Sequence, residues 1–344
     1  MCNIAGYVGR LDAAPILIKM IKAQEGLNGG FYSGLAVHDS SAVCYRKTKG
    51  DFDRLLADTD AEKLVGTTGI IHSRTPSGGD SSWAHPFVTE RCGGVKLAYV
   101  ANGSMGKFGA EKDRFDRLAN ELVREGYDIP CRLNLRDEKY CMLESGEAVH
   151  MSDVMCQLIY KNTETCDSVD AAMARAFCEM PGEIVGLCLD ERFPDRIFYS
   201  RINMPMFVGF DADGAYLASS PTAFPATVES FELLPAASSG VIYCDHSETA
   251  GLKELTKRVR RFNRRTIDMA VRTILAELSL GERDVPALRA TVKRAFPKTE
   301  LLQTHAIVYI ALHKLLSSGH ITEIRARTTL DGRDAPLTLF SAKK

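Results

Sequence analysis

The sequence has few of the features that mark several large classes of protein. No stretch approaches the roughly 18 uninterrupted apolar residues of a membrane span. The ten cysteines form no C-x-x-C pair and no cluster with histidine, which argues against a zinc site and a disulfide framework. A P-loop, a G-x-G-x-x-G motif, a signal-peptide pattern and internal repeats are all missing. We therefore expect a cytoplasmic protein with reduced thiols that needs no metal, no cofactor and no membrane.

Charge is divided unevenly along the chain. The formal net charge of −1 conceals two opposed parts. Residues 251–344 contain 19 Lys and Arg against 9 Asp and Glu, a net charge of +10, whereas residues 1–250 carry −11. A length of 344 residues suits about two domains. The sequence thus predicts an acidic domain over residues 2–250 and a small basic domain over residues 251–344.

The second residue is a cysteine. If Met1 is removed, Cys2 carries both a thiol and a free α-amino group. Because an α-amino group has a pKa of about 8, it can take the thiol proton, so that Cys2 is nucleophile and base at once. The run IAGYVG predicts a first strand with the thiol at its tip. A cysteine in such a place more often packs as a small apolar side chain, so other segments must decide.

Three later segments place polar residues at the ends of predicted strands and helices. In residues 69–87, GIIHSRTPSGGDSSWAHPF, an arginine follows a strand and precedes a hydroxyl residue and a His-Pro pair. Residues 97–106, LAYVANGSMG, form an apolar strand ending in Asn-Gly, and residues 150–160, HMSDVMCQLIY, contain a Ser-Asp step into a helix. The residues concerned are Arg74, Ser77, His85, Pro86, Asn102, Gly103, Ser152 and Asp153. Taken singly, each fits a turn, a helix cap or a surface ion pair equally well.

In this order, and together with Cys2, the segments resemble the class II glutamine amidotransferases. These are the N-terminal-nucleophile glutaminase domains of enzymes such as glucosamine-6-phosphate synthase and glutamate synthase. The resemblance covers residues 2 to about 245 and implies an α+β fold, a four-layer αββα sandwich of two antiparallel sheets between helix layers. Three positions depart from the family pattern: Asn3 replaces a glycine, Asn28 precedes Gly29 in place of an Arg-Gly pair, and Gly78 replaces a polar residue.

The chemistry of an amide substrate explains these residue types. Attack of the Cys2 thiolate on a carboxamide creates an oxyanion, for which the Asn102 side-chain amide and the Gly103 N–H are suitable donors. Free glutamine also carries a carboxylate and an ammonium group. The resemblance implies that Arg74 and Ser77 hold the carboxylate, while Asp153 and Gly103 hold the amine.

The basic segment predicts helices and a hairpin. We expect a long helix over residues 253–279, further helices over 286–296 and 299–317, and a β-hairpin after Gly319 with a DGRD turn. Helices followed by a basic hairpin resemble a winged helix, a module that binds nucleic acid or serves protein contacts. If this domain docks on the acidic half or on a partner, the basic residues from Lys257 to Arg265 should be protected.

These patterns predict a glutaminase that hydrolyses L-glutamine through a Cys2 thioester. Because 94 residues are too few for a synthase domain, we expect the ammonia to pass to a separate synthase or acceptor subunit. Two alternatives stay open: a glutamine-sensing regulatory protein whose tail binds nucleic acid or protein, and an amidase acting on another γ-glutamyl compound. A homo-oligomer is compatible with the sequence. Nucleic acid is not the favoured partner.

Overall fold

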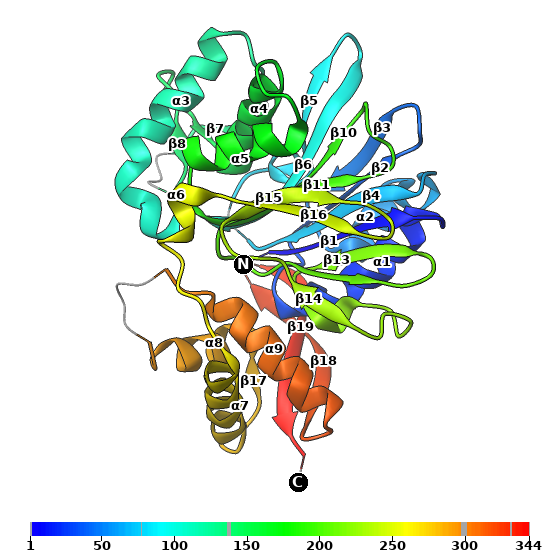
Figure 1. Cartoon of the computed structure of the whole chain (residues 1–344), viewed down its shortest axis with the longest axis vertical. Helices are drawn as coiled ribbons and strands as arrows, with labels where there is room; N and C mark the ends of the chain where they lie inside the picture. The colour runs from blue at the N-terminus through cyan, green and yellow to red at the C-terminus, as the bar shows by residue number, and fades with distance from the viewer. Residues whose placement is uncertain (1, 77, 136–138, 297–300, 331, 344) are drawn as a thin grey trace.

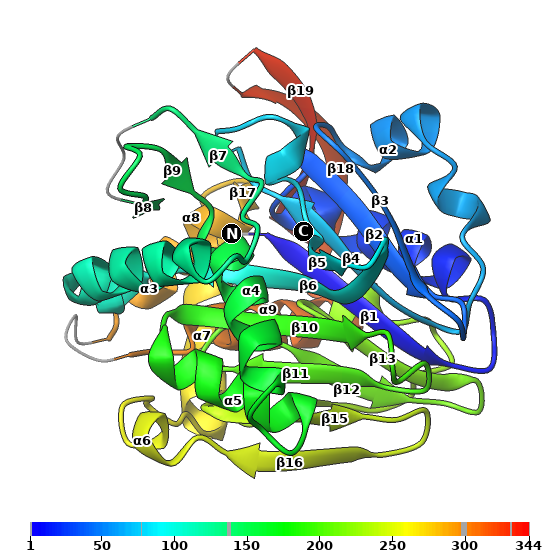
Figure 2. The same ribbon diagram turned by 90° about the horizontal axis from the view of Figure 1, so that it is seen from above.

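Two antiparallel β-sheets face each other in the larger part of the molecule (Figures 1 and 2). The computed structural model describes residues 2–76, 78–135, 139–296, 301–330 and 332–343. The first sheet has the order β14 (Phe231–Leu233), β12 (Phe207–Phe210), β13 (Gly214–Ala218), β1 (Asn3–Gly9), β4 (Thr68–Arg74), β2 (Tyr32–His38), β3 (Val43–Thr48). The second has the order β16 (Ser247–Gly251), β15 (Ser238–Ile242), β11 (Ile197–Arg201), β10 (Glu183–Asp190), β6 (Gly94–Ser104), β5 (Phe87–Arg91).

Helices cover the outer faces of both sheets. The helix α1 (Ala13–Gln24) packs on β1 and β4 of the first sheet, and α2 (Phe52–Asp58) lies beside β2 and β3. On the second sheet lie α4 (Met151–Thr163) and α5 (Val169–Glu179), with α3 (Lys112–Arg124) beside α4. A short sheet of β7 (Arg132–Leu133), β9 (Ala148–Val149) and β8 (Cys141–Met142) adjoins them. The mixed helix and sheet class with antiparallel sheets agrees with the prediction.

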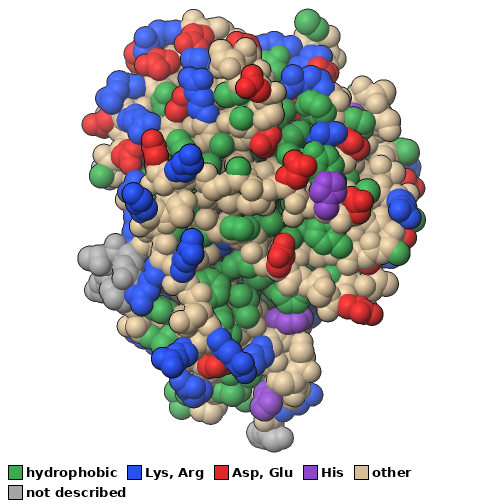
Figure 3. Space-filling view, viewed as in Figure 1, with side chains coloured by type: hydrophobic (Ala, Val, Ile, Leu, Met, Phe, Trp, Pro, Cys, Tyr) green, Lys and Arg blue, Asp and Glu red, His purple; other side chains and the backbone are tan. Residues whose placement is uncertain are grey.

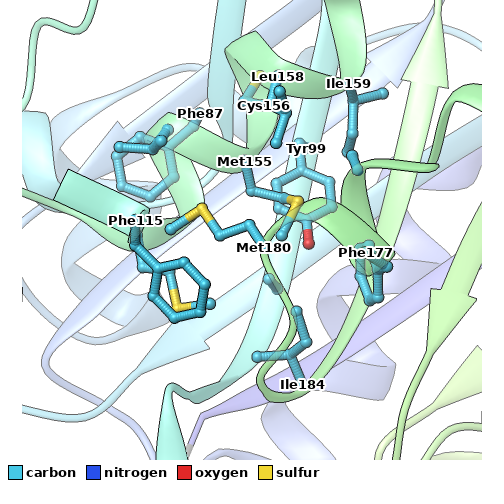
Figure 4. Close-up of a cluster of buried hydrophobic side chains, with 14 of the residues drawn as sticks. Phe87, Tyr99, Phe115, Met155, Cys156, Leu158, Ile159, Phe177, Met180 and Ile184 are labelled. Atoms are coloured by element: carbon cyan, nitrogen blue, oxygen red, sulfur yellow. The ribbon is translucent and has the colours of Figure 1, made fainter. Parts of the chain in front are cut away.

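Burial on both faces explains the strands at the centre of the molecule. Ile4 and Val8 of β1 point into the cluster between the sheets, whereas Ala5 and Tyr7 pack beneath α1. A third cluster fills the space between the second sheet and its helices, where Tyr99 meets side chains of α4 and α5 (Figure 4). With both faces buried, each central strand is a nearly continuous apolar run, and the ends of β1, β4 and β6 are thereby held in fixed positions.

The predicted single helix over residues 253–279 is wrong. The chain instead forms α6 (Lys253–Thr256) and α7 (Arg264–Leu278), separated by an extended segment. In that segment the Arg260 N–H donates to the carbonyl of Leu301 at 2.9 Å, which replaces helical hydrogen bonds. The second helix then starts afresh, because Asn263 caps it in a capping box with Thr266.

The remaining C-terminal predictions are close to the structure. The helices α8 (Val285–Lys293) and α9 (Thr304–Ser317) occupy the predicted places, although residues 297–300 lie outside the described part. The hairpin consists of β18 (Ile321–Leu330) and β19 (Arg333–Ala342); β19 also pairs with β17 (Arg283–Asp284). In the predicted DGRD turn, Asp331 is outside the described residues.

The C-terminal domain rests on the first domain through α9 and the hairpin. Tyr309 of α9 accepts a hydrogen bond from the Asn28 side chain at 2.9 Å, and Arg325 of β18 donates to the carbonyl of Ala23 at 2.6 Å. Arg327 forms an ion pair with Asp51 at 2.9 Å. These contacts explain why α9 is buried almost all round, as its apolar sequence predicts.

The basic segment before α7 is not protected. Lys and Arg side chains gather on the lower domain in Figure 3, and the six basic residues of this segment are all exposed. They are Lys257, Arg258, Arg260, Arg261, Arg264 and Arg265. Of these residues, Arg258 contacts the first domain: its guanidinium carbon lies 4.3 Å from the centre of the Phe108 ring, and its Nη1 atom lies 3.9 Å from a carboxylate oxygen of Glu111. The other contacts between the domains described above are made by α9 and the hairpin. The division at residue 250 stays a prediction, since Leu252, Leu255 and Val259 belong to the core cluster of the first domain.

Two further predictions concern cysteines and membranes. All ten cysteines are free. Among the helices of the described ranges, none combines the length and the apolar character needed to cross a bilayer.

Candidate active site

Cys2 lies where the two sheets meet, directly before β1. The N-terminus marked in Figure 1 lies at the junction of the larger part with the C-terminal domain. The Cys2 side chain is buried, and its backbone nitrogen donates to Oδ1 of Asn102 at 3.0 Å. Asn102 belongs to β6 of the opposite sheet. The predicted nucleophile, Cys2, and the predicted oxyanion donor, Asn102, are thus in contact although they are 100 positions apart in the sequence.

The other end of the Asn102 amide is free to act as a donor. Its Nδ2 atom is buried and has no hydrogen-bond partner among the described residues. Because an unsatisfied buried N–H is costly, a ligand oxygen at this point would gain a strong hydrogen bond. The next residue, Gly103, has φ of +140°, and a Cβ there would lie 2.0 Å from the carbonyl oxygen of Glu183. Only glycine fits, so the backbone can approach a ligand closely.

His72, which sequence reasoning missed, lies beside the thiol. Burial raises the pKa of Cys2, but the charge of His72 and its hydrogen bond outweigh burial, and the pKa falls to about 6. The Nε2 atom of His72 lies 3.0 Å from the Ala101 carbonyl, which can only accept, so Nε2 carries a proton. A signal existed: strand alternation places His72 on the same face of β4 as Arg74.

This pairing predicts an unusual pH dependence for alkylation. Because thiolate is the reactive form, the rate of Cys2 alkylation by iodoacetamide should rise through about pH 6 instead of the usual pH of about 8.5. The substitution His72→Ala should move this midpoint upward by about one pH unit or more. Peptide mass spectrometry measures the extent of alkylation at Cys2, with the exposed Cys92 as internal control. An unchanged midpoint in the variant would contradict the role of His72.

Arg74 is buried at the end of β4, and no carboxylate of the described residues forms an ion pair with it. Its Nη1 atom donates to the Trp83 carbonyl at 3.1 Å and to the Gly78 carbonyl at 3.3 Å. The guanidinium carbon lies 4.6 Å from the centre of the Tyr32 ring. The Nη2 atom is buried and has no partner in the described ranges. A buried cation with a spare donor suits an incoming carboxylate.

The two remaining predicted site residues are Ser77 and Asp153. Ser77 lies outside the described residues. Asp153 is in the first turn of α4, where one oxygen accepts from the Cys131 N–H at 3.2 Å and the other has no partner among described residues. Burial raises the pKa of Asp153 to about 6. Its neighbour Ser152 lines the cavity at Cys2, but Asp153 itself is not among the lining residues.

A cavity of about 530 Å³ opens at Cys2. Arg74, Gly103 and Ser152 line it together with His85, which stacks on His72 with ring centres 3.8 Å apart. Burial lowers the pKa of His85 well below its ordinary value, so this ring is neutral at pH 7. The far wall comes from the C-terminal domain and was not expected from the sequence: Arg289, Lys293, His305. Within the described part of the chain, no group of three or more His, Cys, Asp or Glu could hold a metal ion.

Curated relatives support a common origin for most of the chain. The chain is 25% identical over 236 residues to glutamine--fructose-6-phosphate aminotransferase of Shewanella oneidensis, covering 68% of this chain and 34% of that protein. It is 27% identical over 287 residues to the protein of the same name from Bacteroides thetaiotaomicron, covering 82% and 40%. The chain therefore spans less than half the length of these two relatives. No protein-family model matches it.

A solved structure shares the fold. The glutamine phosphoribosylpyrophosphate amidotransferase of B. subtilis superposes with a TM-score of 0.58 and 14% identity, covering 94% of this chain and 66% of that one. At this identity the likeness concerns the fold alone. It agrees with the two antiparallel sheets and their helices described above.

Proposed function

Because the chain is related to the class II glutamine amidotransferases, as its motifs predict, we propose that it hydrolyses the side-chain amide of glutamine and releases ammonia. The observation that carries the proposal is the Asn102 amide, whose Oδ1 accepts from the Cys2 nitrogen and whose buried Nδ2 has no partner among the described residues. The test is ammonia release from glutamine by purified protein, measured with a coupled glutamate dehydrogenase assay.

The proposed reaction proceeds in two steps. The Cys2 thiolate attacks the amide carbon, and the oxyanion receives hydrogen bonds from Asn102 Nδ2 and the Gly103 N–H. With Met1 removed, the α-amino group holds the former thiol proton and donates it to the departing nitrogen, which leaves as ammonia. Water then attacks the thioester, which yields glutamate and restores the thiol. The contact of the Cys2 nitrogen with Asn102 supports this placement of the amine.

Arg74 is proposed to hold the substrate carboxylate. Arg74→Ala should raise KM for glutamine by a factor equivalent to about 2–5 kcal/mol, because a buried charged contact is lost. The kcat should change far less. Steady-state kinetics test this, with the conservative variant Arg74→Lys expected in between and the surface variant Arg54→Ala, whose side chain is 64% exposed, expected to match the wild type. A folded Arg74→Ala protein with unaltered KM would remove Arg74 from the substrate site.

Removal of Met1 is a separate prediction. The active protein should begin at Cys2, since the proposed proton transfer needs a free α-amine on that residue. Intact-mass spectrometry of the most active fraction should show the loss of one methionine. Full activity in protein that retains Met1 would contradict the role of the α-amine while leaving the thiol mechanism intact.

The C-terminal domain is proposed to be a docking module and not a nucleic-acid reader. Its order of α7, β17, α8, α9 and hairpin fits a winged helix, but α9 and the hairpin already pack on the first domain. We further propose a cytosolic location, an N-terminal-nucleophile sandwich for the first domain and a separate synthase or acceptor subunit as partner. The free cysteines support the cytosolic location, and the larger size of the relatives, of which this chain spans 34% and 40%, supports a synthase partner.

A further inference from the structure

The C-terminal domain supplies a cationic wall to the cavity that contains Cys2. Arg289 and Lys293 are one turn apart on α8, and His305 is in the first turn of α9. All three line the same cavity as Cys2 and Arg74. The site is therefore built by both domains, although Cys2 and His305 are separated by most of the chain.

Arg289 has a neutral partner. Its Nη1 atom donates to Nε2 of His305 at 2.6 Å, and an imidazole nitrogen that accepts a hydrogen bond carries no proton. Burial, together with the charges of Arg289 and Lys293, lowers the pKa of His305 well below its ordinary value. The pair of Arg289 and His305 therefore carries the full positive charge of the guanidinium, because the histidine is neutral. In the described ranges neither Arg289 nor Lys293 forms an ion pair, and Nε of Arg289 is buried without a partner.

The cavity as a whole has an excess of positive charge. Among the described residues, three cationic side chains besides Lys139 line it, against the carboxylate of Glu183: Arg74, Arg289, Lys293. Glu183 is already engaged, since it accepts from the Asn203 side chain at 2.9 Å and from the Lys107 N–H at 3.3 Å. Cationic clefts with low-dielectric walls attract and concentrate anions.

Glutamine leaves part of this space and charge unused. It has about ten non-hydrogen atoms and, at the roughly 30 Å³ that one water molecule occupies in the liquid, fills about 300 Å³ at most. The cavity has about 530 Å³. Glutamine also has only one carboxylate, which the proposed function assigns to Arg74. The cations of α8 therefore have no counterpart on glutamine.

We propose that Arg289 and Lys293, with His305 orienting the arginine, form a subsite for the anionic group of a second small molecule held beside the point of ammonia release. The ligand class is a small compound with a phosphate or carboxylate group. The inference rests on the proposed function, because the second molecule is the one that would react with the ammonia released from glutamine. Its anion site can nevertheless be measured without any turnover.

Isothermal titration calorimetry of the full chain carrying Cys2→Ala tests the subsite, with inorganic phosphate and malonate as probes at constant ionic strength. We expect one of these anions to bind, and we expect Arg289→Gln to weaken its affinity at least tenfold. Lys293→Gln, which leaves the hydrogen bond between Arg289 and His305 in place, should weaken binding at least threefold. Arg265→Gln, on the exposed start of α7, is the matched control and should change affinity less than twofold.

The outcomes distinguish the class of the anion, the failure of the subsite and the failure of the proposed function. Stronger binding of phosphate assigns the subsite to phosphate esters, and stronger binding of malonate assigns it to carboxylates. No binding, or equal losses in the Arg289→Gln and Arg265→Gln proteins, overturns the subsite. Since the Cys2→Ala background is inactive by design, such a failure says nothing against glutamine hydrolysis. Conversely, wild-type protein that binds anions through Arg289 but releases no ammonia overturns only the proposed function.

Discussion

Replacement of Cys2 by alanine is expected to abolish ammonia release from glutamine, with a loss of more than about 10⁴-fold in kcat. Cys2 is the one cysteine among the described residues that line the cavity, and its backbone nitrogen contacts the Asn102 amide. Cys2→Ser should retain at most a trace of activity, since a hydroxyl is a far poorer nucleophile than a thiolate near neutral pH.

The Cys2 experiment needs a control for cysteine loss in general. Cys92 is exposed and remote from the cavity lining, so Cys92→Ala should keep the wild-type rate. Circular dichroism and thermal unfolding establish that each variant is folded. Ammonia release at the wild-type rate by folded Cys2→Ala protein would refute nucleophilic catalysis by this residue.

Removal of the Asn102 donor should produce the second largest effect. Asn102→Ala is expected to lower kcat by about 10²–10³-fold with little change in KM, because the oxyanion exists only after attack. Asn102→Asp is the sharper variant. It keeps an oxygen to accept from the Cys2 nitrogen, but it loses the Nδ2 donor and places a negative charge beside the oxyanion. Its kcat should therefore fall at least as far.

Alkylation of Cys2 distinguishes a missing donor from a disordered site. If Asn102 acts on the oxyanion, Asn102→Ala should still alkylate at Cys2 with a pH midpoint near the wild-type value, whereas the added carboxylate of Asn102→Asp should raise the midpoint. A kcat within about threefold of wild type in Asn102→Asp would reduce Asn102 to a structural residue of β6.

Local motifs predicted the chemistry better than they predicted its surroundings. Cys2, Arg74 and the pair Asn102-Gly103 were identified because their segments occur in the order of the class II glutamine amidotransferases, which no single segment would have indicated. His72 could have been identified from alternation along β4, but a histidine between apolar residues is equally consistent with a core position. Asp153 stays a prediction: it is not among the residues that line the cavity, whereas its neighbour Ser152 is.

The C-terminal contributions could not be predicted from the sequence. Helical periodicity places α8 and α9 within a few residues, but it contains no information on which face contacts a domain made of distant residues. The break between α6 and α7 depends on the hydrogen bond between Arg260 and Leu301, a tertiary contact that overrides local helix propensity. The same limitation concealed Arg289 and His305 as parts of the cavity.

The two-domain construction of the cavity also affects the order of events during protein synthesis. About fifty residues separate Gly251, where the last strand of the two sheets ends, from His305, so at roughly 5–20 residues per second a ribosome needs about 3–11 s to make the second wall once the sheets are complete. During that interval the nascent chain can fold its sheets and position Cys2 next to His72. A thiolate with a pKa of about 6 is then open to oxidants and electrophiles until α8 and α9 close over it. Slow translation of the last third should therefore increase oxidation at Cys2 in newly made protein.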